Sequence, residues 1–195
     1  MTSPEGDGAG AARKPERLEG RGIGSISPRV SAPFPFLGFL ALFLILPQAA
    51  GAACQDPPQP GVDWRRCLLV GRDLSNADLA GAVLRDASFD RAILRRATLA
   101  RADAPSARFV SADLEDADLE GAVLMRADFT RANLRGARLA RADLRRARVF
   151  RADLSGADLT GARLDGADLL HAVLDGARWT DGERICAEGS VGGCQ

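Results

Sequence analysis

The sequence of 195 residues contains no tyrosine and only one histidine, His171. It also has no serine with a plausible base beside it and no glycine-rich phosphate loop joining a strand to a helix. Its many aspartates recur with a repeat, where carboxylates are usually solvated rather than paired for acid–base chemistry. We therefore predict that the protein is not an enzyme and that it holds no cofactor and no metal ion.

The chain also lacks an excess of charge of either sign, because 26 basic residues balance 26 acidic residues. A protein without net charge has no overall field that would attract a polyanion. This balance argues against a dedicated nucleic-acid binder, so no nucleic-acid partner is predicted.

What the sequence has in abundance is a repeat of five residues. Alanine occupies every fifth position from Ala77 to Ala177 without exception, and an apolar residue follows two places after each alanine. These central residues run from Leu74 to Trp179, and only Ala104 among them is small. A period of five matches neither an α-helix nor a flat strand, so a continuous apolar stripe needs a corner in every repeat. The pattern predicts a β-solenoid with the alanine and the central residue inward and the other three positions outward.

The number of repeats in one coil follows from the bulkiest central residues. These recur 20 positions apart, at Phe89, Phe109, Phe129 and Val149. The spacing predicts that four repeats complete one coil and that these side chains stack in one column. Outward charges alternate in sign at the same spacing: Arg108, Asp128, Arg148 and Asp168; Asp118, Arg138, Asp158 and Arg178; Arg95, Glu115 and Arg135. We expect opposite charges to face one another on successive rungs, each exposed pair contributing roughly 0.2–1 kcal/mol.

Three repeats carry further shared residues, namely Ala-Asn-Leu-Arg-Gly at 132–136, Ala-Asp-Leu-Ser-Gly at 152–156 and Ala-Asp-Leu-Thr-Gly at 157–161. They resemble the pentapeptide-repeat family, and the resemblance covers a little over half of the chain. It implies an all-β fold, a right-handed quadrilateral (four-sided) β-helix, whose members differ in what the coil touches. It also implies an alternative function, a cytoplasmic DNA mimic that modulates type II topoisomerase (gyrase). The nearly equal numbers of basic and acidic residues in these repeats disfavour that alternative.

The chain before the repeats divides into two parts. Residues 1–33 are rich in Gly, Pro, Ser, Arg and Glu, and are predicted to be a disordered leader. Residues 34–53 begin with an uncharged run from Phe34 to Leu46 and end in small residues. Behind a basic leader this pattern is typical of a signal peptide, and predicts a periplasmic or secreted protein. The alternative is a membrane anchor, since Val30 to Ala53 carries no charge and could just span a bilayer.

A solenoid has two open ends, which must be covered. We predict the β-helix over residues 72–181, an N-terminal cap over residues 54–71 and a C-terminal cap loop over residues 182–195. The two tryptophans of the chain, Trp64 and Trp179, lie near these ends and are large enough to close them. Uncovered rungs would offer unpaired backbone groups and apolar side chains to other chains. An alternative is that one coil end forms a homodimer interface.

Only four cysteines occur, two before the repeats and two after them. Because an exported protein meets an oxidising compartment, we expect one local disulfide at each end, from Cys54 and Cys67 and from Cys186 and Cys194. Alternatively, Cys67 is in frame with the alanines and could be an inward-facing free thiol of the first rung.

Stacking at 20 residues also places the outward residues in columns. Phe150 and Leu170 fall in one column, whose neighbour holds Arg131, Arg151 and His171. Together these residues form an apolar strip edged with cations, which we predict to be an interaction patch for an unidentified protein partner. The alternative is a solvated face with single exposed apolar residues.

Basic residues are also unevenly spread along the coil. Between Arg131 and Arg151 there are eight arginines and a single acidic residue, Asp143. This basic belt could meet an anionic surface, or it could neutralise acidic rungs above and below. Taken with the leader and the repeats, the sequence predicts an exported, non-catalytic structural or protein-interaction module of the cell envelope.

Overall fold

The computed structural model describes residues 54–195, so the predicted leader (1–33) and signal peptide or anchor (34–53) lie outside the described residues. Residues 54–195 contain no helix and no continuous strand. No helix in this part of the chain is therefore long and apolar enough to cross a membrane. Instead, every fifth residue from Asp63 to Arg178 forms isolated β-bridges, most of them to both neighbouring rungs.

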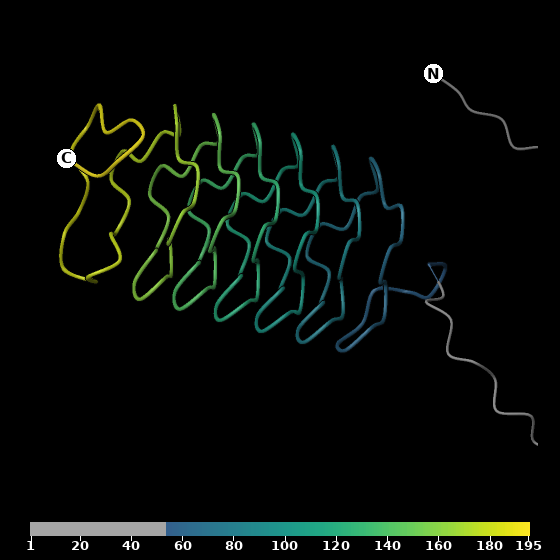
Figure 1. Cartoon of the computed structure of the whole chain (residues 1–195). Coiled ribbons are helices and arrows are strands. Elements are labelled where there is room, and N and C mark those ends of the chain that lie inside the picture. Colours follow the sequence, from purple (N-terminus) through teal and green to yellow (C-terminus); the bar gives the residue numbers. More distant parts are fainter. Residues whose placement is uncertain (1–53) are drawn as a thin grey trace, which may run out of the picture. The chain divides into compact units, whose positions relative to one another are not determined.

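The bridges fix the register of the coil. Twenty parallel bridges join residues 20 positions apart, from Asp63 with Val83 to Asp158 with Arg178. Four successive repeats therefore make one coil, and the chain winds as a right-handed quadrilateral β-helix of six rungs (Figure 1). The predicted fold and the spacing of 20 residues are confirmed. We number the four faces by their central residues: Trp64 to Leu164 (first), Leu69 to Leu169 (second), Leu74 to Leu174 (third) and Leu79 to Trp179 (fourth).

The interior consists of the alanines and the central side chains. Phe89, Phe109 and Phe129 are fully buried and stacked, with ring centroids 5.1 and 4.8 Å apart and nearly parallel planes. Val149 continues the same column and is buried. Even the small Ala104 is fully buried at its central position. The apolar stripe is thus continuous, as the repeat of five predicts.

Each turn of the backbone depends on two local features. The residue two places after the central residue, called the corner residue here, has a left-handed φ, for example 60° at Arg131 and 64° at Gly136. The residue before the central one is often aspartate, whose carboxylate accepts the backbone N–H two places on. This bond is made by Asp78, Asp118, Asp128, Asp153, Asp158 and Asp168. Many recurring aspartates therefore have a structural role in the turns.

The regular coil starts earlier than the predicted boundary at residue 72. Asp63 and Leu68 already form parallel bridges with Val83 and Ser88. Trp64 is fully buried as a central residue of the first rung, rather than lying as a lid before it. The cause is that this segment keeps the apolar spacing of five although it lacks the alanines.

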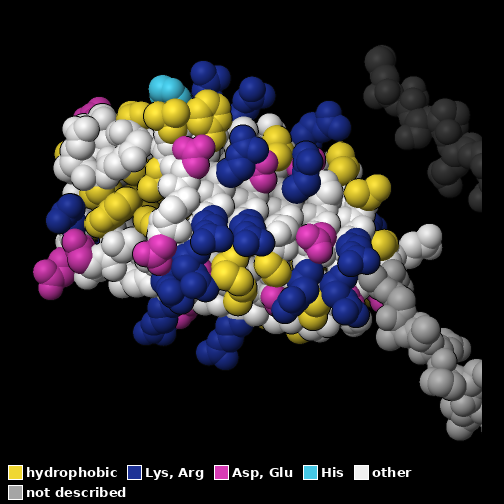
Figure 2. Space-filling model, viewed as in Figure 1, with side chains coloured by type: hydrophobic (Ala, Val, Ile, Leu, Met, Phe, Trp, Pro, Cys, Tyr) yellow, Lys and Arg dark blue, Asp and Glu magenta, His cyan; other side chains and the backbone are white. Residues whose placement is uncertain are grey.

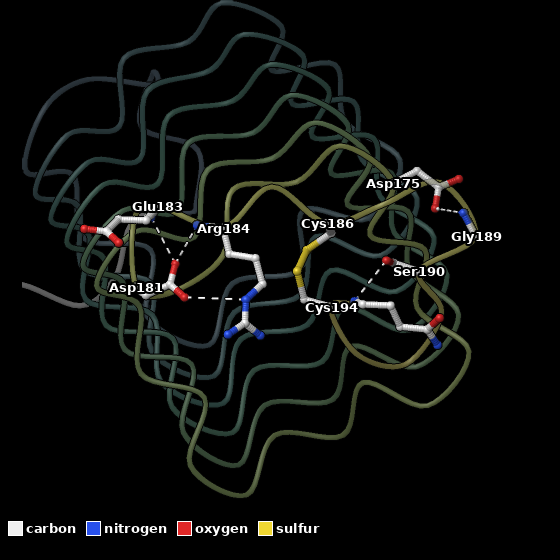
Figure 3. The surroundings of a disulfide bond; sticks show 9 residues. Asp175, Asp181, Glu183, Arg184, Cys186, Gly189, Ser190 and Cys194 are labelled. Carbon is white, nitrogen blue, oxygen red and sulfur yellow. Dashed lines mark hydrogen bonds and ion pairs between the residues drawn. A yellow bond between two sulfur atoms is a disulfide. The ribbon is translucent and has the colours of Figure 1, made fainter.

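The C-terminal tail folds back over the last rung. Ile185 and Val191 form antiparallel bridges with Arg178 and Val173, so the tail covers the third and fourth faces. Trp179 is partly buried against the core. Figure 3 shows the tail crossing the end of the coil as a compact loop.

Candidate interaction surface

Both ends of the coil carry a disulfide. Cys54 is bonded to Cys67 and Cys186 to Cys194 (Figure 3), which are the pairs expected from the sequence. Cys67 is also fully buried at an alanine position, as the alternative interpretation of the sequence expected. The free thiol that this alternative assumed is wrong, because Cys67 is in a disulfide. The first disulfide ties the segment before the coil to its first rung, and the second closes the tail.

Outward charges form ion pairs between rungs at the predicted spacing of 20. Arg95 reaches Glu115 at 3.2 Å, and Arg138 reaches Asp118 at 3.3 Å. Arg148 lies 3.7 Å from Asp128. These three contacts are among the eight neighbouring pairs of the predicted charge ladders.

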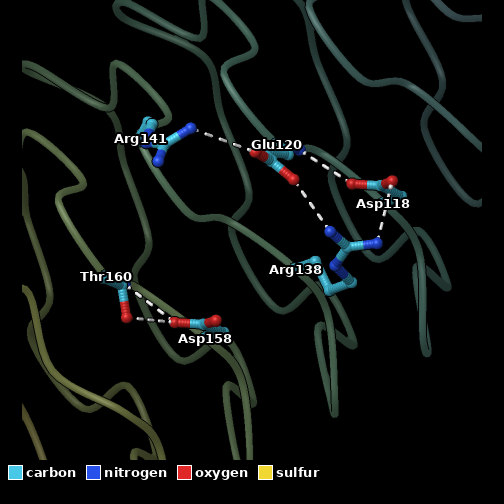
Figure 4. Close-up of polar contacts among 6 residues, drawn as sticks. All are labelled: Asp118, Glu120, Arg138, Arg141, Asp158 and Thr160. Atoms are coloured by element: carbon cyan, nitrogen blue, oxygen red, sulfur yellow. Dashed lines mark hydrogen bonds and ion pairs between the residues drawn. The ribbon is translucent and has the colours of Figure 1, made fainter. Parts of the chain in front are cut away.

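Shorter ion pairs join residues 18 positions apart, which the sequence reasoning missed. Arg85 lies 2.6 Å from Asp103, and Arg108 lies 2.7 Å from Asp90 although Asp128 is its neighbour on the next rung. Such pairs run diagonally across one face. One partner follows the central residue of its rung, as Arg85 does, and the other precedes the central residue of the next rung, as Asp103 does. Figure 4 shows both kinds at Arg138, which binds Asp118 directly and Glu120 diagonally at 2.8 Å. A search for opposite charges at a separation of 18 would have found them.

The five residues of the predicted interaction patch lie together at the C-terminal part of the second face. The Arg151 guanidinium carbon lies 5.1 Å from the centroid of the Phe150 ring, and the His171 ring meets that ring edge-on at 5.8 Å. The backbone N–H of Arg131 donates to the carbonyl of Phe150, and that of Arg151 to the carbonyl of Leu170. Leu170 is 58% exposed. Figure 2 shows hydrophobic side chains gathered beside the histidine, with basic side chains on the same side of the coil.

The predicted basic belt is largely neutralised within the coil. Five of its eight arginines contact a carboxylate: Arg135, Arg138, Arg141, Arg145 and Arg148. A side-chain hydrogen bond from Arg145 lowers the pKa of Asp143, the one acidic residue inside the belt. Among the described residues, Arg131, Arg146 and Arg151 form no ion pair. Of the belt, these three are the arginines that residues 54–195 leave without a carboxylate partner.

Those three arginines are corner residues, and they follow a general rule of this coil. Nine corner positions in residues 54–195 carry arginine. Among these described residues, Arg141 is the one corner arginine that contacts a carboxylate, while Arg96 bonds the Asn76 side chain. The corner arginines without an ion pair in the described chain are Arg66, Arg91, Arg101, Arg126, Arg131, Arg146 and Arg151. Most arginines beside a central residue are instead ion-paired. In the sequence, an arginine without an ion pair can be sought two places after the central residue of a repeat.

A shallow hollow lies at the corner between the first and second faces. It measures about 430 Å³ and is lined by Met125, Arg126, Arg145, Arg146 and Asp165. The Arg145 guanidinium donates to the Asp143 carboxylate and contacts the Met125 sulfur. Arg126 and Arg146 are exposed and form no ion pair within residues 54–195. No group of three metal-ligating side chains occurs in this part of the chain.

Comparison with known proteins points to one family. A family model described as pentapeptide repeats matches in eight copies, over residues 73–109, 107–146 and 152–178. Similar solved structures include a pentapeptide-repeat protein from the thylakoid lumen of Arabidopsis thaliana, at 27% identity over 63% of this chain and 83% of that chain, with a TM-score of 0.39. Rfr23, a pentapeptide-repeat protein from the cyanobacterium Cyanothece, is 32% identical over 53% and 64%, with a TM-score of 0.36. QnrB1, a plasmid-mediated fluoroquinolone resistance protein, is 22% identical over 58% and 65%, with a TM-score of 0.41. None of the curated proteins compared matches the chain.

Proposed function

Because the chain belongs to the pentapeptide-repeat family, we propose that it is an exported, non-catalytic protein that acts in the cell envelope through the outer surface of its β-helix. It serves there as a structural or protein-interaction module. The coil supplies a rigid scaffold, since every rung is tied to the next by backbone hydrogen bonds such as that from Leu114 to Asn133 at 2.7 Å. Function then resides in the side chains that the scaffold displays.

The observation that carries the proposal is the cluster formed by Phe150, Leu170, Arg151 and His171. Aromatic and arginine side chains are enriched in the energetically important parts of protein interfaces. Here the Arg151 guanidinium lies over the face of the Phe150 ring and the His171 ring packs edge-on against it. Leu170 in the same column is 58% exposed. A partner that covers the patch would bury Leu170 without displacing any side chain from the core.

Export is supported by two independent features. The uncharged run from Phe34 to Leu46 behind a basic leader is typical of a signal peptide. All four cysteines are in disulfides, which suits an oxidising compartment outside the cytoplasm.

Cell fractionation with mass spectrometry of the protein's N-terminus tests export. We expect the protein outside the cytoplasm, as a mature chain starting near Cys54 or as a membrane-anchored chain. Recovery of a cytoplasmic protein with residues 1–52 intact would overturn export and leave the gyrase alternative.

Crosslinking in the envelope fraction, followed by affinity purification, tests the patch. The Phe150→Asp variant should lose a partner that the wild-type protein retains. Val110→Asp is the matched control, because Val110 occupies the same column two rungs away. Loss of the partner in both variants, or in neither, would contradict a specific role of the patch.

A further inference from the structure

Two rows of unpaired arginines flank the second face in the C-terminal half of the coil. Arg126 and Arg146 are the corner residues that precede this face, and Arg131 and Arg151 are those that follow it. All four are exposed, and none forms an ion pair with a described residue. Within each row the arginines lie on neighbouring rungs, about 4.8 Å apart along the coil. Each row therefore concentrates positive charge that residues 54–195 leave without a counterion.

The surface between the two rows becomes apolar toward its C-terminal end and carries two aspartates, one of which is paired with an arginine. Phe150 is partly exposed and Leu170 is 58% exposed. Of the aspartates on this stretch, Asp128 lies near Arg148 at 3.7 Å, and Asp168 accepts the backbone N–H of Leu170 at 3.1 Å. Four arginines without a carboxylate partner in residues 54–195 therefore lie along the two edges of this face. Phe150 lies on the rung of Arg146 and Arg151, and Leu170 lies on the next rung.

We propose that this surface, consisting of Arg126, Arg131, Arg146, Arg151, Phe150 and Leu170, binds the face of an anionic phospholipid bilayer. A β-helix face is flat, because each rung repeats the same backbone path 20 residues on, and a flat surface suits the plane of a bilayer. Arginine presents a planar fork of donors that pairs with phosphate oxygens, so both rows can bind lipid phosphates. Leu170 and Phe150 then enter the boundary between headgroups and acyl chains, which adds apolar burial to the electrostatic attraction.

Charge complementarity favours a bilayer over an acidic folded protein. Lipid phosphates move laterally and can match two rows of arginines on either side of a face, whereas a folded partner needs carboxylates fixed at both spacings. Neighbouring cations such as Arg131 and Arg151 also repel one another, and lipid phosphates relieve that repulsion. The inference rests on the proposed envelope function for bringing the protein to a membrane in the cell. The lipid affinity itself does not depend on that function, because it is measured with purified protein.

The test is sedimentation of the purified protein, as isolated from cells, with vesicles of phosphatidylcholine or of an equimolar mixture with phosphatidylglycerol. The ratio of the two affinities removes any contribution of residues 1–53 that does not depend on lipid charge. We expect a clear preference for the anionic vesicles that weakens as salt is raised. The double variant Arg131→Gln, Arg151→Gln should lower affinity for anionic vesicles roughly 30-fold, at about fivefold per arginine.

The matched control is Arg96→Gln, Arg101→Gln, which removes the same charge from corner positions of the third and fourth faces. It should keep the preference for anionic vesicles within about twofold of wild type, because those corners do not flank the second face. Leu170→Ser should weaken binding at high salt more than at low salt. Circular dichroism verifies that each variant retains the β-helix.

Two results would overturn the proposal. One is an absence of preference for anionic vesicles in the wild-type protein. The other is an equal loss in both double variants, which would show that total charge matters rather than this face. If vesicle binding is absent but a protein partner is still lost in Phe150→Asp, the patch serves a protein and the lipid proposal alone is wrong.

Discussion

The ring of Phe109 lies parallel to the ring of Phe129, with the centroids 4.8 Å apart and the planes inclined by 4°. That separation equals the spacing of neighbouring β-strands, so each ring occupies one rung. Both rings are fully buried, and Phe89 extends the stack on the other side of Phe109. The three phenylalanines therefore fill one column of the interior, and Phe109 contacts an aromatic neighbour on each side.

Removing the middle ring tests this column. We expect Phe109→Ala to lower the free energy of unfolding by about 3–5 kcal/mol, because neighbouring rungs held by backbone hydrogen bonds cannot close the cavity. Denaturant unfolding measures the loss. Phe150→Ala is the control, since Phe150 is a partly exposed outward residue and its loss should cost no more than about 1 kcal/mol. Similar losses in both variants would contradict the stacked column.

The regular part of the coil could be predicted because one physical rule repeats in it. Alanine and a large apolar residue recur at fixed positions, so burial alone fixes which side chains point inward. The bulky Phe89, Phe109 and Phe129 then fix the number of repeats in a coil. For the same reason the columns of the outer surface were predicted, including the neighbourhood of Phe150 and His171.

Other features could not be predicted, because they depend on contacts between rungs or on sequence outside the repeat. The diagonal pair of Arg108 with Asp90 exists because the long arginine side chain crosses the face to a neighbouring rung, which a strict column of 20 does not describe. Val62 and Cys67 replace alanine in the first rung, so its start was placed too late. Residues 182–195 carry no repeat, and their antiparallel path gave no sequence signal. That most corner arginines form no ion pair with residues 54–195, Arg141 being the exception, also became visible only in three dimensions.

Enlarging an inward alanine tests the narrowness of the coil. Ala132 is 1% exposed beside the central residues, so Ala132→Leu adds methylene groups to a space that is already filled. We expect a loss of roughly 1–3 kcal/mol in stability from overpacking. Ala140→Leu adds the same groups at an outward, partly exposed position and should change stability by about 0.5 kcal/mol or less. A neutral Ala132→Leu variant would show that the interior has room to spare.

Breaking the C-terminal disulfide tests the role of the cap. The double variant Cys186→Ser, Cys194→Ser should lose about 2–3 kcal/mol, because the unfolded chain gains freedom when the bridge is absent. The effect should be greatest near the cap, where the N–H of Gly176 donates to the carbonyl of Cys186. Hydrogen exchange should accelerate at Gly176 and Leu174 while Leu114, in a middle rung, stays protected. Unchanged exchange at Gly176 would mean that the tail holds the last rung without the disulfide.

Acid should weaken the coil through aspartates that accept hydrogen bonds in its turns. The Thr160 hydroxyl donates to Asp158 at 2.6 Å, and this bond lowers the pKa of Asp158 although burial opposes the shift (Figure 4). A carboxyl whose pKa is lower in the folded state stabilises that state above its unfolded pKa of about 3.9, and the contribution disappears as pH falls through the folded value. The melting temperature should therefore drop as pH falls below about 4. Asp158→Asn and Thr160→Val should each flatten this drop, because one removes the titrating group and the other the hydroxyl that shifts its pKa. An acid profile that neither variant changes would show that the Asp158 turn does not contribute to the acid sensitivity of the coil.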